Sequence, residues 1–171
     1  RWLEKLSQKL MTLVLLQEEI TLRPESVSEL FEAVRETTAD SLEQKGVTLS
    51  VECGMDRTLM DFDLMRSALV NLVENAKNAS EPGQQIELRA CGGRFEVADR
   101  GKGIPPEEIA RITEPFYRID RSRSKLSGGS GLGLALVKRI AEAHGARLEI
   151  ESTLGEGTTM RLVFPQEMTT V

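Results

Sequence analysis

The chain has 171 residues, of which 40% are hydrophobic and 29% charged, and it carries a formal net charge of −5. This length is enough for one domain with a substantial core, and the acidic balance argues against nucleic acid as a partner, which needs a basic stripe. No apolar run has the length of a membrane span and no signal peptide opens the chain, which begins at Arg1 rather than Met. We therefore expect a cytoplasmic piece of a longer protein that makes no direct membrane contact itself, and we leave open whether its full-length parent is membrane-anchored.

The first predicted element is a helix over residues 2–20, whose apolar residues recur at alternating spacings of three and four. This seam consists of Leu3, Leu6, Leu10, Leu13 and Ile20, with Gln17 as a polar exception. Two interpretations stay open, a helix packed on its own domain and the end of a dimerisation helix. We favour the second because Leu22-Arg-Pro24 then ends the helix and leaves the seam little to pack against. The chain is thus predicted to divide into residues 1–22, the end of a dimerisation helix, and a domain over residues 23–171.

The rest of the chain is predicted to alternate helices with short strands. Apolar residues at helical spacing and capping residues predict helices over 26–44, 63–79, 105–112 and 132–144. Alternating apolar residues predict strands over 47–52, 57–60, 85–90, 94–98, 146–152 and 158–164. Cys53 and Cys91 lie in or beside these strands, without metal-binding spacing, and are expected to be free, buried thiols. With helices on one face of a mixed, mostly antiparallel sheet, the pattern predicts an α+β fold, a two-layer α/β sandwich preceded by a short N-terminal helix.

Two glycine-rich segments stand out, Asp99-Arg-Gly101-Lys-Gly103-Ile104 and Gly128-Gly-Ser-Gly131-Leu-Gly133-Leu134. In the first, a carboxylate that ends a strand can accept a hydrogen bond from the amine of adenine, and the glycines let the backbone approach a flat ring. An ordinary turn explains this segment equally well by itself. The second opens onto a helix, whose unpaired N–H groups attract anions, although a glycine-rich hinge is the alternative. Together the segments predict a pocket that holds adenine at one end and phosphates at the other.

Two asparagines lie upstream of these segments, on one face of a predicted helix. Asn71 and Asn75 are four residues apart, and an amide oxygen is a hard, neutral ligand suited to Mg²⁺. The alternative is an ordinary polar helix face. Residues 118–125 are basic and serine-rich, so they form either a solvated loop or a lid whose cations, such as Arg118, screen phosphates. His144, the only histidine, precedes a helix-ending glycine, and we assign it no chemistry.

In this order the motifs resemble the GHKL ATP-binding superfamily, most closely the catalytic ATP-binding domain of bacterial sensor histidine kinases. The matching motifs are an N box (Asn71-Leu-Val-Glu-Asn75-Ala), the glycine box at 99–103, an F box (Glu114-Pro-Phe116-Tyr-Arg118), the glycine box at 129–134, and Gly155-Glu-Gly157-Thr158. Five boxes over about residues 60–164 are a specific signal. The resemblance implies a Bergerat-type fold for residues 23–171, with ATP and Mg²⁺ as cofactors.

The resemblance also implies roles for individual residues. Asp99 binds the adenine amine with support from Thr158, and Asn75 ligates Mg²⁺ while Asn71 faces the phosphates; these two asparagines are the candidate catalytic residues. The residues implied to line the base or the phosphates are Gly101, Gly103, Ile104, Tyr117, Arg118, Gly129, Gly131, Leu132 and Gly133. Asn78 stands where many sensor kinases carry a Lys or His that contacts phosphate, and it is the remaining candidate contact. Lid residues such as Arg118, Arg121 or Lys125 are then expected to meet the phosphate charge.

Position 71 separates the subfamilies, because hydrolysing relatives and anti-sigma serine kinases typically place there a Glu that activates water or a hydroxyl. A neutral imidazole is already nucleophilic, so Asn71 favours a kinase that donates the γ-phosphate to histidine. His144-Gly145 does not resemble the acceptor motif, so the acceptor is expected on a dimerisation domain outside this chain. The implied partners are that phosphoacceptor domain of the same kinase, a response regulator receiver domain, and a second copy in the parent homodimer. The alternative is a GHKL-type regulatory module such as an anti-sigma factor serine kinase.

Overall fold

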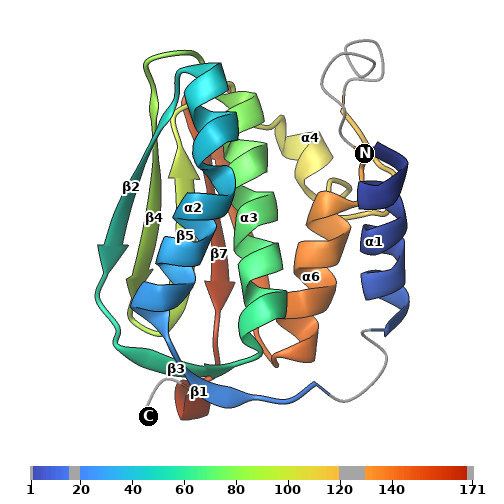
Figure 1. The fold of residues 1–171 in the computed structure, drawn as a ribbon. Helices are drawn as coiled ribbons and strands as arrows, with labels where there is room; N and C mark the ends of the chain where they lie inside the picture. Colours follow the sequence, from blue (N-terminus) through green and yellow to red (C-terminus); the bar gives the residue numbers. More distant parts are fainter. Residues whose placement is uncertain (1, 16–19, 120–129, 169–171) are drawn as a thin grey trace.

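The computed structural model describes residues 2–15, 20–119 and 130–168 (Figure 1). Its helices are α1 (Trp2–Leu15), α2 (Val27–Lys45), α3 (Phe62–Ala79), α4 (Pro106–Ile109), α6 (Gly133–Ala143) and the 3₁₀ helix η1 (Gln166–Met168). Its strands are β1 (Arg23–Ser26), β2 (Thr48–Cys53), β3 (Arg57–Met60), β4 (Gln85–Cys91), β5 (Arg94–Asp99), β6 (Arg147–Thr153) and β7 (Gly157–Val163).

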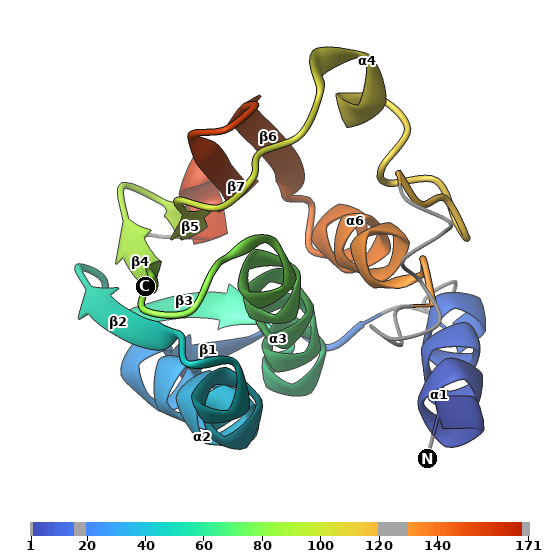
Figure 2. The same ribbon diagram turned by 90° about the horizontal axis from the view of Figure 1, so that it is seen from above.

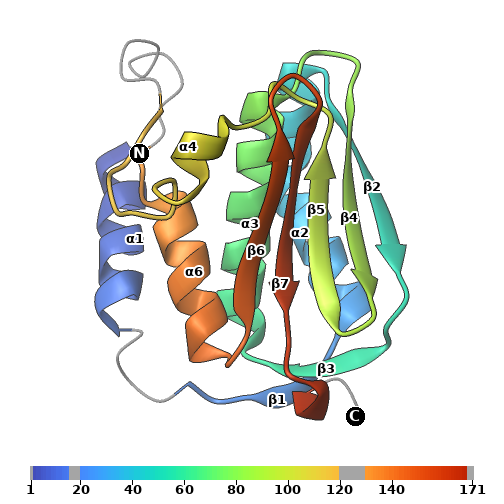
Figure 3. The ribbon, with the colours of Figure 1, turned by 180° about the vertical axis from the view of Figure 1, so that it is seen from behind.

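Five strands form the main sheet, in the order β2-β4-β5-β7-β6. β2 pairs with β4 in parallel, and the other neighbours are antiparallel. Helices α2, α3 and α6 cover one face of this sheet, whereas the view from behind looks directly onto the strands (Figures 2 and 3). The predicted α+β two-layer sandwich with a mixed, mostly antiparallel sheet is therefore confirmed.

The core lies between the helices and the covered face of the sheet. Strand β4 shows how the sequence builds it, because Ile86, Leu88 and Ala90 alternate inward and are at most 1% exposed. Phe95 contacts Phe31 of α2 and Phe164 edge to face, with ring centroids 5.4 and 4.9 Å apart. Burying each such side chain contributes about 1.5–3 kcal/mol relative to leaving it exposed, so this core fixes how the helices lie on the sheet.

Capping residues explain where the two central helices begin. The Ser26 hydroxyl accepts from the N–H of Glu29 at the start of α2, and the Asp61 carboxylate accepts from the N–H of Leu64 at the start of α3. The predicted ranges 26–44 and 63–79 agree with both helices to within one residue at each end.

Three details differ from the sequence predictions. β1 was not predicted, and it forms a separate two-stranded sheet with β3 that passes below the ends of the helices (Figure 1). α4 covers only Pro106–Ile109 of the predicted 105–112, and turns follow it. Cys53 and Cys91 are free, as predicted, but both are exposed rather than buried. Cys53 ends the edge strand β2, and Cys91 projects to the face of β4 opposite the buried Ile86, Leu88 and Ala90.

Helix α1 lies beside α6, on the side away from α3 (Figures 1 and 2). Part of its apolar surface stays exposed, since Leu3, Leu10 and Met11 are 70%, 38% and 58% exposed. α1 thus packs on its own domain while two leucines of the heptad seam, Leu3 and Leu10, face solvent. Among the described helices, none combines the length and apolar character that crossing a membrane requires.

Candidate functional site

Three polar residues form a row across the covered face of the sheet. Asp99 of β5 pairs with Thr158 of β7, which in turn pairs with Ser152 of β6. Directly paired residues project to the same face, and the preceding row, Val97, Met160 and Ile150, packs with the core. The row at Asp99 therefore lies where the apolar core ends and a polar site begins.

The Asp99 carboxylate is held by backbone groups. Its Oδ1 accepts from the N–H of Gly101 at 2.8 Å. Burial raises the pKa of the Asp99 carboxyl above its ordinary 3.8, and the N–H groups of Gly101 and Thr158, which favour the charged form, offset part of that rise. A partly buried carboxylate fixed in this way is a directional acceptor for an amine such as that of adenine.

Ser152 connects the sheet to the first glycine segment. Its Oγ accepts from the N–H of Ile104 at 2.8 Å, lies 2.8 Å from Thr158 Oγ1 and donates to the carbonyl of Gly157 at 2.9 Å. Two predicted site residues, Thr158 and Ile104, are thus joined through one hydroxyl, and the backbone N–H of Thr158 links them to Asp99. Sequence reasoning missed Ser152, because its place beside Thr158 follows from the register in which β6 and β7 pair.

The glycines of the first segment are required by contacts within the chain. A side-chain carbon at Gly101 would lie 2.2 Å from the carbonyl oxygen of Ala79 on α3, and one at Gly103 would lie 2.1 Å from that of Thr153. The segment is therefore clamped between the last turn of α3 and the β6–β7 hairpin. The glycines were predicted to let the backbone approach a flat ring. In the structure, the absence of side chains at Gly101 and Gly103 lets the backbone of Ala79 and Thr153 pack close to this segment.

Asn71 and Asn75 lie one turn apart on α3, and Asn78 follows on the exposed side of its last turn. Asn71 is 9% exposed, and its Nδ2 donates to the carbonyl of Ser67 at 2.7 Å. Asn75 Nδ2 is buried and has no hydrogen-bond partner among the described residues. Because buried polar groups are normally hydrogen-bonded, the unpartnered amide nitrogen of Asn75 is consistent with a site that a polar ligand completes.

The oxygen ligand that Asn75 offers also fits Mg²⁺. Among the described residues, no three side chains of the His, Cys, Asp and Glu types gather to hold a metal. Mg²⁺ commonly takes one or two protein oxygens together with substrate phosphates and waters. The amide oxygen of Asn75 is a donor of that kind.

Helix α6 begins at this end of the site. Its N-cap residue, Leu132, makes no side-chain capping bond, and its first turn carries no acidic residue, so its first N–H groups and the positive end of its dipole are available to an anion. A side-chain carbon at Gly133 would lie 3.1 Å from Asn71 Oδ1. α6 therefore starts directly beside Asn71 of α3.

The remaining predicted residues lie at the border of the site. Gly131 accepts through its carbonyl from the N–H of Phe116 at 2.9 Å, which ties the second glycine segment to the F box. Tyr117 is turned toward α4, where its hydroxyl donates to Glu108 and Arg111 lies 4.3 Å above its ring. Arg118 is half-buried. Gly129, Arg121 and Lys125 lie outside the described residues.

A further residue was missed by sequence reasoning. Lys9 of α1 donates through Nζ to Asn71 Oδ1 at 2.8 Å. The two residues are 62 positions apart, and no periodicity or motif joins them, so only the packing of α1 on α6 could disclose this contact.

His144 is buried inside the fold rather than presented for chemistry. It is 1% exposed, and its Nε2 accepts from the N–H of Asp61 at 3.0 Å. Nδ1 therefore carries the proton and donates to the carbonyl of Ile140 at 2.7 Å. The prediction that His144 plays no chemical role fits this structural position.

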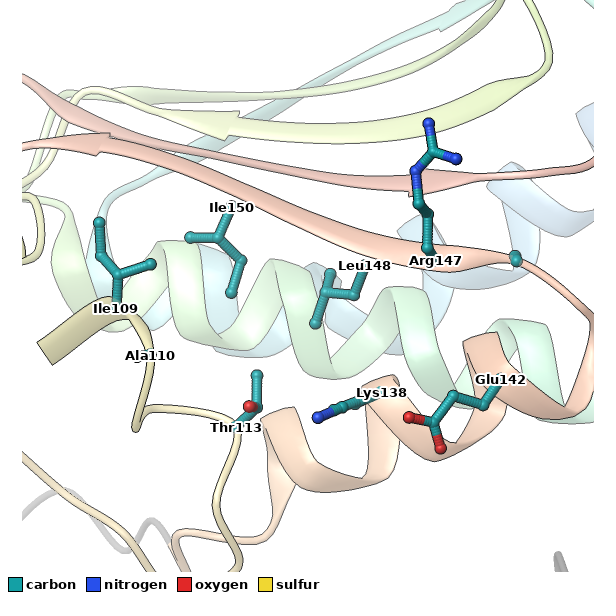
Figure 4. A pocket seen from close by; sticks show the side chains of 9 residues that line it. Ile109, Ala110, Thr113, Lys138, Glu142, Arg147, Leu148 and Ile150 are labelled. Carbon is teal, nitrogen blue, oxygen red and sulfur yellow. The ribbon is translucent and has the colours of Figure 1, made fainter.

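A hollow of about 350 Å³ lies elsewhere, between α4, α6 and β6 (Figure 4). Its lining includes Ile109, Lys138, Leu148 and Ile150 and none of the predicted site residues. Thr113, Lys138, Glu142 and Arg147 also line this hollow. Because Asp99, Asn71 and Asn75 are not among its lining residues, we do not assign it to the nucleotide.

Comparison with known proteins agrees with the motifs. Residues 60–168 match the family described as "Histidine kinase-, DNA gyrase B-, and HSP90-like ATPase". The circadian input-output histidine kinase CikA of Synechococcus elongatus is 33% identical over 156 residues, covering 86% of this chain and 21% of CikA. The sensor-like histidine kinase SenX3 of Mycobacterium tuberculosis is 43% identical over 113 residues, covering 64% of this chain and 28% of SenX3. The chain thus spans less than a third of the length of either relative.

Among solved structures, full-length ShkA in complex with AMPPNP superposes with a TM-score of 0.81 at 29% identity, covering 94% of this chain and 35% of ShkA. The family match includes both asparagines of α3, Asp99 and the start of α6. The chain belongs to the histidine kinase-, DNA gyrase B- and HSP90-like ATPase family, and its curated relatives CikA and SenX3 are histidine kinases.

Proposed function

We propose that this chain is the catalytic ATP-binding part of a two-component sensor histidine kinase, which binds Mg-ATP and donates its γ-phosphate to a histidine. The observation that carries the proposal is the position of Asp99, a partly buried carboxylate fixed by Gly101 at one end of α3, with the start of α6 beside Asn71 further along the same helix. The AMPPNP complex of ShkA supports a nucleotide at this site.

The roles of the residues follow from their chemistry. Asp99 accepts from the adenine amine, and Thr158 and Ile104, joined through Ser152, hold the wall beside it. The first N–H groups of α6 bind phosphate oxygens, and the amide oxygen of Asn75 is a ligand for Mg²⁺, which neutralises phosphate charge when bound. Catalysis is then mainly positioning and electrostatic stabilisation, as is general for phosphoryl transfer.

The surroundings of Asn71 favour histidine over water as the acceptor. Asn71 is a neutral amide and cannot act as a general base, and Glu74 nearby is occupied elsewhere. One Glu74 oxygen accepts from Ser41 on α2 and the other accepts from Lys77. With no carboxylate base next to Asn71 among the described residues, the chain is expected to hydrolyse ATP slowly.

The exposed face of α1 supports the proposed division of the chain. Leu3, Leu10 and Met11 present an apolar surface that fits the end of a dimerisation helix over residues 1–22, with residues 23–171 as the catalytic domain. The partners of the parent are then its own dimerisation and phosphoacceptor domain, a second copy, and the receiver domain of a response regulator. We place this domain in the cytoplasm.

The chemistry of the phosphorylated product tests the proposal. The full-length protein that contains this chain is incubated with γ-labelled Mg-ATP, and the labelled protein is exposed to acid and to alkali. We expect a label that acid removes and alkali does not, as for phosphohistidine.

A label that survives acid indicates a hydroxyl acceptor. That outcome would reject the proposal in favour of a GHKL-type regulatory serine kinase, such as an anti-sigma factor. Rapid release of free phosphate without protein labelling would reject both and indicate a hydrolase.

A further inference from the structure

A lysine of α1 reaches the phosphate end of the candidate site. Lys9 Nζ donates to Asn71 Oδ1 at 2.8 Å, while Asn71 Nδ2 donates to the carbonyl of Ser67 at 2.7 Å. The second bond fixes which side of the amide carries the oxygen, so Asn71 presents its acceptor toward α1. Both partners are at least half-buried, and the contact is not a chance encounter of two solvated side chains.

Lys9 and the start of α6 meet at the same point. A side-chain carbon at Gly133 would lie 3.8 Å from Lys9 Nζ and 3.1 Å from Asn71 Oδ1. α6 has 11 residues, and its N-terminus carries the positive end of the helix dipole. An ammonium group and a helix N-terminus thus converge on Asn71, and both attract an anion.

The direction of α3 identifies which part of a nucleotide reaches this point. At the adenine end, the N–H of Lys102 donates to the carbonyl of Ala79, in the last turn of α3, at 3.0 Å. Asn71 lies about two turns earlier, roughly 12 Å along the helix axis. A nucleotide whose base lies at Asp99 and whose phosphates follow α3 has its terminal phosphate nearest Asn71 and Lys9.

We propose that Lys9 binds the terminal phosphate of ATP and makes the site distinguish ATP from ADP. The proposal rests on the nucleotide site proposed above, and it adds a residue from outside the matched range 60–168.

The same contact couples the nucleotide to α1. Because Lys9 belongs to α1, a terminal phosphate bound to it holds α1 against α6, and by reciprocity docked α1 strengthens ATP binding. ADP lacks that phosphate and cannot make this contact. The nucleotide state is thereby communicated to the helix whose leucines face solvent.

Calorimetry with Mg-ATP and Mg-ADP tests the proposal on the chain itself. Lys9→Met removes the charge and keeps the apolar stem, Lys9→Arg keeps the charge, and Lys138→Met makes the same change on the exposed side of α6. A charge-assisted hydrogen bond predicts that Lys9→Met weakens ATP binding by about tenfold and ADP binding by less than about twofold. Lys9→Arg and Lys138→Met should keep the wild-type preference. Amide hydrogen exchange of residues 2–15 should slow with ATP more than with ADP in the wild type, and equally in Lys9→Met.

The outcomes separate this inference from the proposed function. A wild type that binds neither nucleotide overturns the nucleotide site itself. If the wild type binds both nucleotides and its ATP-to-ADP affinity ratio equals that of Lys9→Met, the role of Lys9 is overturned while the nucleotide site stands. Equal losses of ATP and ADP binding in Lys9→Met indicate a structural role and also overturn it.

Discussion

Asp99 and Thr158 occupy paired positions on adjacent antiparallel strands, with both side chains on the helix-covered face of the sheet. The Thr158 hydroxyl lies 2.8 Å from Ser152 Oγ, and the backbone N–H of Thr158 supports the Asp99 carboxylate. The adenine end of the proposed site is therefore built by strand register, which positions these groups more rigidly than a loop can.

This pairing predicts a selective effect of removing one hydroxyl. Thr158→Val keeps the shape of a residue that is 5% exposed and deletes its hydrogen-bonding group. We expect ATP binding to weaken by about two- to tenfold, the range for one neutral hydrogen bond. Calorimetry measures it, with Thr159→Val as the matched control, because the side chain of Thr159 projects to the opposite face. Equal affinities for Thr158→Val and Thr159→Val would remove the Thr158 hydroxyl from the site.

The clamp on the first glycine segment predicts that Gly101 cannot be replaced. In Gly101→Ala the new carbon meets the Ala79 carbonyl at 2.2 Å, and since both sides are backbone, the segment must move. We expect a loss of about 3 kcal/mol in the free energy of unfolding, measured by urea denaturation. Gly155→Ala is the control, because its φ is +83° but nothing lies within 4 Å of the new carbon, and it should cost only about 1–2 kcal/mol. A milder loss in Gly101→Ala than in Gly155→Ala would contradict the clamp.

His144 predicts a pH dependence of stability. Burial lowers the pKa of His144 below its ordinary 6.5, and the hydrogen bonds with Ile140 and Asp61 offset part of that shift. The folded state therefore favours the neutral ring, so its contribution is fully present above about pH 6.5 and is lost as the pH falls toward the lower folded-state pKa. Urea denaturation from pH 7.5 to 5.5 should show this decline in the wild type.

The variant His144→Gln supplies the comparison for that series. It should lose about 1–3 kcal/mol at pH 7.5, because the N–H of Asp61 loses its partner, and it should vary less with pH over the same range. Parallel pH profiles for the two proteins would show that His144 is not the titrating group.

For Asp99, the dependence of folding stability on pH is expected to have the opposite sign from that of His144. Its pKa is raised in the folded state, mainly by burial, so ionisation of Asp99 costs stability as the pH rises through that value. At pH 7 Asp99→Asn is therefore expected to unfold at the same or a higher urea concentration than the wild type, since the amide oxygen can still accept from Gly101. A clear loss of stability in this variant would mean that Asp99 serves the fold rather than a ligand.

Much of the fold could be predicted from local signals. Ser26 predicted the start of α2, and apolar residues at helical spacing predicted α3. Apolar alternation predicted the five strands of the main sheet to within one residue. β1 could not be predicted, because Arg23-Pro-Glu-Ser26 has no alternation and becomes a strand only by pairing with β3. Cys91 was mispredicted because its place on the outward face of the alternation in β4 was overlooked. Cys53 was mispredicted because the sequence does not indicate that β2 lies at the edge of the sheet.

The residues of the candidate site also divide into those that the sequence could predict and those that it could not. Its motif residues could be predicted, since Asp99, Thr158 and Ile104 meet in one hydrogen-bonded group. Ser152 and Lys9 could not, because the first depends on strand register and the second on the docking of α1. The nucleotide contacts of all the motif residues, Tyr117 and Arg118 included, remain predictions, and the Tyr117 hydroxyl donates to Glu108 in this structure.

The central claim, that Asp99 anchors the adenine of ATP, is tested most directly by titrating Mg-ATP into the wild type, Asp99→Asn and Asp40→Asn in a calorimeter at pH 7.5. Asp40 is an exposed residue of α2 and controls for the same change in charge. Loss of a charge-assisted hydrogen bond predicts that Asp99→Asn binds about 10- to 100-fold more weakly, while Asp40→Asn matches the wild type. Equal ATP affinities for Asp99→Asn and the wild type would contradict the account.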